Sequence, residues 1–234
     1  MRLDKLLSNE GFGTRKEVKK LIKDGLVTVN RNIITKDDFK VDPNIDEILI
    51  DGAKLEYEEY SYYIMNKPAG YVCANIDNLY PTVFELMGSS YKDNLFTIGR
   101  LDLDTEGLLL ITNDGMLSHK LISLKYHVPK KYYFTFEGTI NDAKIKKLEN
   151  GMAIDDYITK PAKYESISKN EGYLTIEEGK FHQVKKMLEA VGCKITYLKR
   201  ISFGPLTLND DLKIKNFRKL TEEEKNILFK CCEK

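Results

Sequence analysis

The amino-acid sequence predicts an α+β protein in which a small, basic module precedes a larger part, and three observations lead to this prediction. The first 36 residues have apolar residues at helical spacing and hold nine Lys or Arg against four Asp or Glu. From Tyr60 onward, short apolar strands alternate with turn residues. Near residue 181 a helical stripe returns. The chain of 234 residues has room for two domains, which we expect at 1–58 and 59–234.

Composition indicates a protein without a metal site or a membrane span. The formal net charge is +1, so total charge does not indicate a nucleic-acid partner. Four cysteines without C-x-x-C spacing and three scattered histidines predict reduced thiols and no metal site. No apolar run reaches the roughly 18 residues that cross a bilayer, and no targeting segment is evident. We therefore expect a cytoplasmic protein that does not bind membranes.

Two short helices are predicted at the N-terminus. Leu3, Leu6 and Leu7 form an i, i+3, i+4 stripe for the first helix. The second begins at a capping box, with Thr14 as the N-cap and Glu17 three residues later. Basic residues on neighbouring elements can form one cationic patch that suits a folded RNA backbone, although an ordinary solvated helix face remains the alternative. The residues of this patch are Arg2, Lys5, Arg15 and Lys19.

The N-terminal pattern resembles a known RNA-binding module. The run R-L-D-K-L-L…G-x-G-T-R…L-I-x-x-G-x-V-x-V-N, over residues 2 to about 41, resembles the S4 domain. The resemblance implies that this part binds RNA. Residues 42–59 are predicted to end the small domain and to continue as an acidic linker.

The most informative motif spans residues 99–110, with the sequence G-R-L-D-L-D-T-E-G-L-L-L. It places Arg100, Asp102 and Asp104 in a turn that leads into an apolar strand at 108–112. A carboxylate beside a cation at a strand entrance suits chemistry better than stability. One alternative is a calcium loop, which would need a Glu where Asn113 stands. Another is that both aspartates are only turn and capping residues.

Three further segments carry candidate site residues. Lys67 lies in the predicted turn N-K-P-A-G, where it is either a phosphate contact or a surface turn residue. Tyr132 precedes a predicted strand at 133–137, and is either a core residue or a stacking platform. The third segment, E-G-K-F-H-Q-V-K-K-M, spans residues 178–187 and is predicted to be helical.

Helical geometry predicts a partner for Lys185. At about 100° per residue, this side chain lies at the margin of the apolar face, where an ammonium group that reaches inward needs a carboxylate. Asp102 is the candidate partner, and extension of Lys185 into water is the alternative. The residues predicted for the buried face are Phe181, Val184, Leu188 and Val191.

Together, these segments resemble the RsuA-type RNA pseudouridine synthases over nearly the whole chain and in the family's order. The resemblance implies a catalytic domain with a mixed, largely antiparallel sheet crossed by a cleft, and a monomer. It implies that Asp102 is the catalytic residue, that Tyr132 stacks on the target uracil and that Lys185 controls the charge of the aspartate. Arg100 and Lys67 are the expected RNA contacts of this domain.

The implied reaction breaks the N-glycosidic bond of uridine, turns the uracil over and rejoins it through C5. It needs no redox change and no group donor, so no cofactor is expected. Asp102 either attacks C1′ as a nucleophile or removes the 2′ proton to give a glycal, and the sequence leaves both routes open. A nucleosidase that pairs Asp102 with Asp104 is a rival, although strand alternation would separate the two carboxylates.

The domain layout most resembles enzymes that act on 16S ribosomal RNA, at uridine 516 in reference numbering. Enzymes of the same layout act on 23S RNA, so that target stays open, as does the choice between naked RNA and a ribosomal assembly intermediate. An RNA-binding assembly factor with an inert enzyme domain is the remaining alternative.

Overall fold

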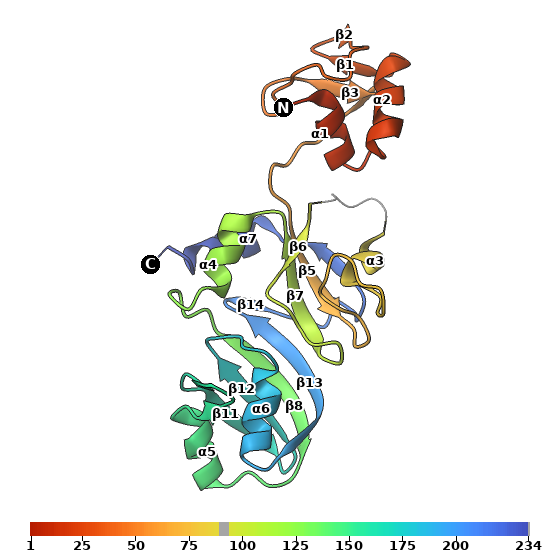
Figure 1. Ribbon diagram of the computed structural model, residues 1–234. Helices are drawn as coiled ribbons and strands as arrows, with labels where there is room; N and C mark the ends of the chain where they lie inside the picture. Colours follow the sequence, from red (N-terminus) through yellow and green to blue (C-terminus); the bar gives the residue numbers. More distant parts are fainter. Residues whose placement is uncertain (89–93, 234) are drawn as a thin grey trace. The chain divides into compact units, whose positions relative to one another are not determined.

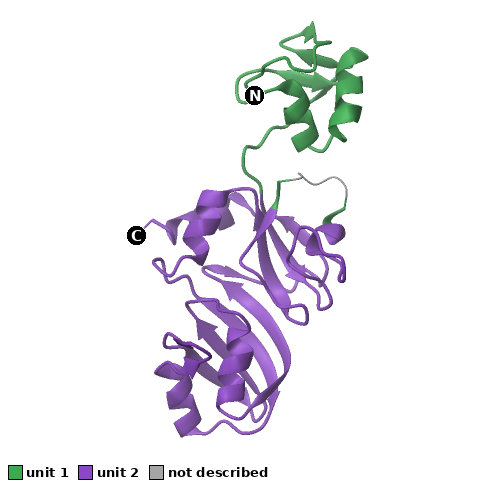
Figure 2. Cartoon of the chain, in the orientation of Figure 1, with its two compact units in different colours: residues 1–61, 87–95 green, residues 62–86, 96–234 purple. Residues whose placement is uncertain are grey.

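The computed structural model describes residues 1–88 and 94–233, and the chain divides into two compact units (Figure 2). Unit 1 comprises Met1–Ser61 and Met87–Leu95, and unit 2 comprises Tyr62–Leu86 and Phe96–Lys234. Among the described residues, no helix combines the length and the apolar character that crossing a bilayer requires.

Unit 1 combines two helices with a small antiparallel sheet (Figure 1). Its elements are α1 (Leu3–Asn9), α2 (Arg15–Lys23), β1 (Val27–Val29), β2 (Asn32–Ile33), β3 (Ile48–Ile50) and β4 (Ala53–Lys54). The strands lie in the order β2-β1-β3-β4. The segment after residue 41 is therefore more structured than predicted, because β3 pairs with β1 and β4 extends the sheet.

Local sequence signals explain both helices of unit 1. Leu3, Leu6 and Leu7 are fully buried, as their spacing predicted. The predicted capping box is present: the Thr14 hydroxyl accepts a hydrogen bond from the Glu17 N–H, and the Glu17 carboxylate accepts one from the Thr14 N–H. Such an N-cap stabilises a helix by about 1 kcal/mol, so α2 is held by its own sequence as well as by burial.

Unit 2 is built on one large sheet. Its strands are β5 (Tyr62–Lys67), β6 (Phe96–Ile98), β7 (Glu106–Thr112), β8 (Lys130–Glu137), β9 (Ala153–Ile154), β10 (Tyr157–Ile158), β11 (Lys163–Ser168), β12 (Glu171–Ile176), β13 (Lys194–Phe203), β14 (Leu206–Thr207) and β15 (Phe217–Lys219). The helices that follow residue 61 are α3 (Val83–Met87), α4 (Gly115–Ile122), α5 (Asp142–Glu149), α6 (Gln183–Ala190) and α7 (Glu222–Lys230).

The topology of this sheet confirms the predicted mixed, largely antiparallel arrangement. Its main path runs β11-β12-β8-β13-β7-β5-β15, while β14 pairs with β13 and β6 with β7. Strands β13 and β7 are parallel, and the neighbouring pairs β8–β13 and β5–β7 are antiparallel. The sheet therefore places β7 next to β13, and β13 next to β8.

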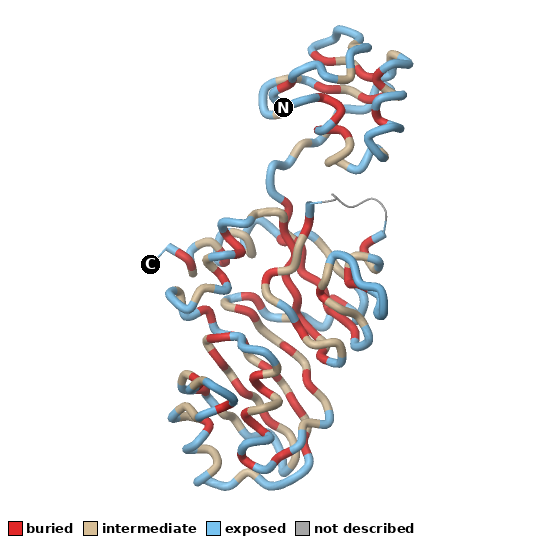
Figure 3. Tube along the Cα trace, in the orientation of Figure 1, coloured by how far each residue is buried: buried red, intermediate tan, exposed pale blue. Residues whose placement is uncertain are grey.

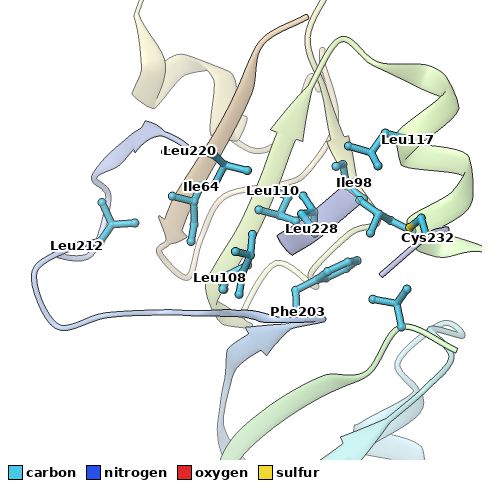
Figure 4. Close-up of a cluster of buried hydrophobic side chains, with 13 residues drawn as sticks. Ile64, Ile98, Leu108, Leu110, Leu117, Phe203, Leu212, Leu220, Leu228 and Cys232 are labelled. Carbon is cyan, nitrogen blue, oxygen red and sulfur yellow. The ribbon is translucent and has the colours of Figure 1, made fainter. Parts of the chain in front are cut away.

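Buried apolar side chains support the central strands of unit 2. Leu108 and Leu110 of β7 belong to one cluster with Ile64 of β5 and Phe203 of β13 (Figure 4). Leu109, which points to the other face, is also fully buried. Figure 3 shows such buried stretches along the central strands, with exposed loops around them. Because β7 is covered on both faces, it is a firm support for the turn that precedes it.

Helix α6 begins later than the sequence pattern suggested. Phe181 was predicted to lie on the buried face, but α6 starts at Gln183 and Phe181 is 68% exposed in the preceding turn. That prediction was wrong because His182 has a φ of 53°, a left-handed conformation that interrupts the helical path. The other predicted positions are buried: Val184, Leu188 and Val191.

Candidate active site

A pocket of about 530 Å³ lies in unit 2. Its walls come from the turn before β7, the start of β8, the segment that leads into α6 and the end of β13. The pocket brings together four residues that the sequence singled out and two that it did not. These residues are Arg100, Asp102, Tyr132 and Lys185, with Lys130 and Arg200.

Asp102 and Lys185 form an ion pair at this pocket, as helical geometry predicted. Lys185 Nζ lies 3.1 Å from Asp102 Oδ2, and each side chain keeps about a quarter of its surface exposed. His182 Nε2 lies 3.6 Å from the other carboxylate oxygen, Oδ1. Partial burial opposes the charge of Lys185, but its hydrogen bonds to the two aspartates outweigh burial and raise its pKa. Lys185 is therefore a cation at neutral pH.

Asp104 binds the same ammonium group. Its Oδ1 lies 2.5 Å from Lys185 Nζ. Partial burial alone would raise the pKa of Asp104, but the hydrogen bond and charge of Lys185 lower it. Both aspartates lie in the turn rather than in a strand, so the expected separation by strand alternation does not apply. A hydrolytic glycosidase needs one carboxyl group whose pKa is raised, and the shift at Asp104 has the opposite sign.

Lys67 is the last residue of β5 and is fully buried, so it is not a surface turn residue, and its ammonium group is not exposed for contact with a phosphate. Its Nζ donates hydrogen bonds to the backbone carbonyls of Pro68 (3.0 Å), Asp102 (3.0 Å), Leu103 (3.4 Å) and Thr105 (2.8 Å). Burial lowers the pKa of Lys67, although nearby acidic groups oppose that shift. The side chain thus fixes the turn that carries Asp102.

Two further groups bind this turn. The Gly70 N–H donates to the Leu103 carbonyl at 2.7 Å. The Cys73 thiol lies 3.6 Å from the Leu101 carbonyl, to which it donates, and accepts from the Leu101 N–H at 3.4 Å. Burial raises the pKa of this thiol, so it stays a neutral donor. Residues 67–73 therefore form the support of the turn.

Gly107 allows β7 and β13 to approach closely. It has a φ of 105°, and a Cβ added there would lie 2.2 Å from the Arg200 carbonyl oxygen. The contact arises from the parallel register, in which Gly107 is opposite Arg200. A larger residue would separate the strands directly behind the turn.

Tyr132 lies on the buried face of β8 and lines the pocket with 7% of its surface exposed. It is thus both packed and available at the pocket wall. Lys130 lies on the same face of β8, and Arg200 is the cross-strand partner of Tyr132. Neither cation was predicted from the sequence as a site residue. Strand alternation was the one signal that could have placed Lys130 beside Tyr132, whereas the register that brings in Arg200 has no local signal.

Buried polar contacts position the start of α6. Gln183 Nε2 donates to Glu178 Oε1 at 2.7 Å, and Gln183 Oε1 accepts from the Lys180 N–H at 3.0 Å. Glu178 Oε1 also accepts from the Lys160 N–H at 2.9 Å. These contacts explain the polar residues of the E-G-x-x-x-Q segment, since they fix the helix that carries Lys185.

Arg100 is exposed and lines the pocket. The calcium alternative fails because residues 106–112 form β7 rather than the second half of a metal-binding loop. Within the described part of the chain, no group of three or more metal-ligating side chains comes together.

Only some of the basic side chains predicted to form a cationic patch in unit 1 are free of an acidic partner in the described part of the chain. Arg2 and Lys19 lie 2.9 Å and 2.8 Å from aspartate oxygens of the same unit. Lys5 and Arg15 are exposed. The surface therefore has less uncompensated positive charge than the sequence suggested.

The chain resembles known proteins over almost its whole length. Residues 61–190 match the RNA pseudouridylate synthase family, and residues 1–44 match the S4 domain. It is 45% identical over 234 residues to the uncharacterized RNA pseudouridine synthase YtzG of Bacillus subtilis, covering 97% of this chain and 98% of that protein. It is 37% identical over 227 residues to ribosomal small subunit pseudouridine synthase A of Escherichia coli K12, covering 96% and 98%. A crystal structure of a pseudouridylate synthase matches with a TM-score of 0.69 and 35% identity, covering 97% of this chain and 99% of that one.

Proposed function

Because the chain belongs to the RNA pseudouridylate synthase family, we propose that it isomerises uridine to pseudouridine in 16S ribosomal RNA, at uridine 516 in reference numbering. The observation that carries the proposal is the ion pair of Asp102 with Lys185 in the same pocket as Tyr132. The small-subunit substrate is supported by the 37% identity to ribosomal small subunit pseudouridine synthase A over nearly the full length of both chains. We expect a cytoplasmic monomer that acts on this RNA or on an assembly intermediate.

Asp102 starts the reaction in this proposal. It either bonds to C1′ and displaces the uracil or removes the 2′ proton to give a glycal. Lys185 binds Oδ2 of the carboxylate, and we assign either step to Oδ1, which lies 3.6 Å from His182 Nε2. The cation also keeps Asp102 in place and balances its charge.

Tyr132 supplies the wall on which the uracil rests. A base that leaves the RNA stack costs a few kcal/mol, and an aromatic platform recovers part of that cost. The walls of the pocket keep the detached uracil near C1′ until C5 bonds to it. Arg100 and the exposed cations of unit 1 contribute contacts to the RNA backbone.

The test uses unmodified 16S and 23S transcripts, each alone and as partly assembled ribonucleoprotein. After incubation with the protein, carbodiimide labelling and primer extension map pseudouridine. We expect one new stop, in 16S RNA at the proposed uridine. A stop only in 23S RNA would refute 16S RNA as the substrate but would still support the proposed reaction. No stop in any sample, with tight RNA binding, would favour the inert assembly factor.

A further inference from the structure

Two buried cations flank one aromatic ring at the wall of the pocket. Arg200 is 2% exposed and Lys130 is 6% exposed. In the β8–β13 register, Arg200 is opposite Tyr132 and Lys130 is opposite Phe203. The Arg200 guanidinium and the Lys130 ammonium each lie 5.1 Å from the centroid of the Phe203 ring. Both cations therefore belong to the wall that also carries the proposed uracil platform.

These cations have hydrogen-bonding capacity that the described residues do not use. Arg200 Nε donates to the Leu108 carbonyl at 2.8 Å, but the buried Nη2 has no hydrogen-bond partner in the described part of the chain. Lys130 Nζ has three N–H donors and donates to the Val128 carbonyl at 2.8 Å. The buried Thr105 hydroxyl at the same pocket also lacks a partner among the described residues.

This arrangement destabilises the folded protein when no ligand is bound. A buried charged donor is costly unless an acceptor meets it, and two like charges near each other add to the cost. Burial, followed by the charge of Arg200, lowers the pKa of Lys130 to about 8. Buried donors that destabilise the folded protein are expected at binding sites, where the ligand supplies the missing hydrogen-bond acceptors.

The isomerisation of uridine supplies that acceptor. When the N1–C1′ bond breaks, the electron pair stays on the uracil and spreads over N1, O2 and O4. The ring then turns, C5 bonds to C1′, C5 loses its proton, and N1 gains one. The negative charge exists only between bond breakage and rejoining, whether Asp102 acts as nucleophile or base. Cations at the carbonyl oxygens would therefore stabilise this state more than the substrate.

We propose that Arg200 and Lys130 bind the carbonyl oxygens of the target uracil and stabilise the anion that it becomes. The inference rests on the proposed function and adds two catalytic residues to it. It also gives a reason to select uracil, because cytosine presents an amino group at C4, where a donor of the protein would meet another donor.

The test compares Lys130→Met, Lys130→Arg and Arg200→Lys with a matched control, Lys131→Met. Lys131 is the next residue of β8, but its Nζ binds Glu165 at 2.5 Å and it does not line the pocket. Single-turnover rates are measured on 16S RNA that carries either uridine or 5-fluorouridine at the target. Fluorine withdraws electrons and stabilises the departing anion by itself. The measured quantity is loss of the N1-linked nucleoside, analysed by nuclease digestion and mass spectrometry.

For Lys130→Met we expect the rate on uridine to fall about 100-fold, as for loss of one donor to a developing anion. The fall should be clearly smaller on 5-fluorouridine and largely reversed in Lys130→Arg. Arg200→Lys should show the same substrate dependence, and Lys131→Met should leave both rates unchanged. Equal losses on both substrates, or a normal rate for folded Lys130→Met, would overturn the inference. If wild type is active, that result leaves the proposed function standing, whereas a wild type that modifies no ribosomal RNA refutes the proposed function.

Discussion

One buried ammonium group holds the turn that carries Asp102, so replacing Lys67 with Met tests how the site is built. The change removes the donor to four backbone carbonyls. Two of these carbonyls keep a backbone N–H donor, whereas those of Pro68 and Thr105 lose the donor that Lys67 supplies. A buried carbonyl without a partner costs about 1–3 kcal/mol, which gives about 2–6 kcal/mol for the two. Removal of a desolvated charge offsets part of this, so we expect a net loss of about 2–4 kcal/mol.

The assay is urea unfolding followed by circular dichroism, together with single-turnover pseudouridine formation on the same preparation. Lys169→Met is the control, because that lysine is exposed and its loss should change stability by about 0.5 kcal/mol at most. Because the turn positions Asp102, we expect Lys67→Met to form pseudouridine more slowly than wild type even under conditions in which the variant is folded. A loss below about 1 kcal/mol together with normal turnover would show that Lys67 does not hold the turn.

Three other predictions concern the strand contact, the RNA surface and the pH dependence. Gly107→Ala should destabilise the protein by about 2–5 kcal/mol, because the added Cβ meets the Arg200 carbonyl and the φ is positive. Gly115→Ala, which meets nothing within 4 Å, is its control, and similar unfolding midpoints for the two would contradict the steric argument. Replacing both Lys5 and Arg15 with Gln should weaken RNA binding and reduce the salt slope by about 1–2, whereas an unchanged slope identifies an ordinary solvated surface. The pKa of Lys130 is about 8 in the folded protein and about 10.5 in the unfolded chain, so Lys130 should make the protein more stable as the pH rises from about 8 to 10.5. Activity should fall as the pH rises through about 8, because Lys130 then loses its charge in the folded protein. Lys130→Met should lack that gain in stability. If the variant and wild type show the same dependence of stability on pH, Lys130 is not the group that titrates.

Much of the architecture follows from local sequence signals. The stripe of α1, the capping box of α2 and the apolar run of β7 each lie within a few neighbouring residues, where helix and strand periods decide the outcome. Helical geometry also predicted a carboxylate partner for Lys185, with Asp102 as the candidate, but it did not predict that Asp104 would bind the same ammonium group.

Other features depend on contacts between distant segments. Lys67 looked like a turn residue because its sequence neighbours are polar or turn-forming, and only the fold brings the carbonyls of residues 102, 103 and 105 to its ammonium group. Arg200 reaches the pocket through the pairing of β13 with β8 and β7, which no local pattern encodes. The prediction that Phe181 is buried was wrong for a local reason, because the spacing of apolar residues does not reveal the left-handed backbone of His182.

The most direct test of the central claim measures pseudouridine formation and RNA binding for Asp102→Asn beside wild type, on 16S RNA under single-turnover conditions. Asn has nearly the same shape and can still accept a hydrogen bond from Lys185, so fold and RNA affinity should be retained. It can neither bond to C1′ as a carboxylate nor remove the 2′ proton, so we expect no detectable pseudouridine. Near-normal turnover by this variant would contradict the assignment of Asp102 and of the pocket around it as the site of the reaction.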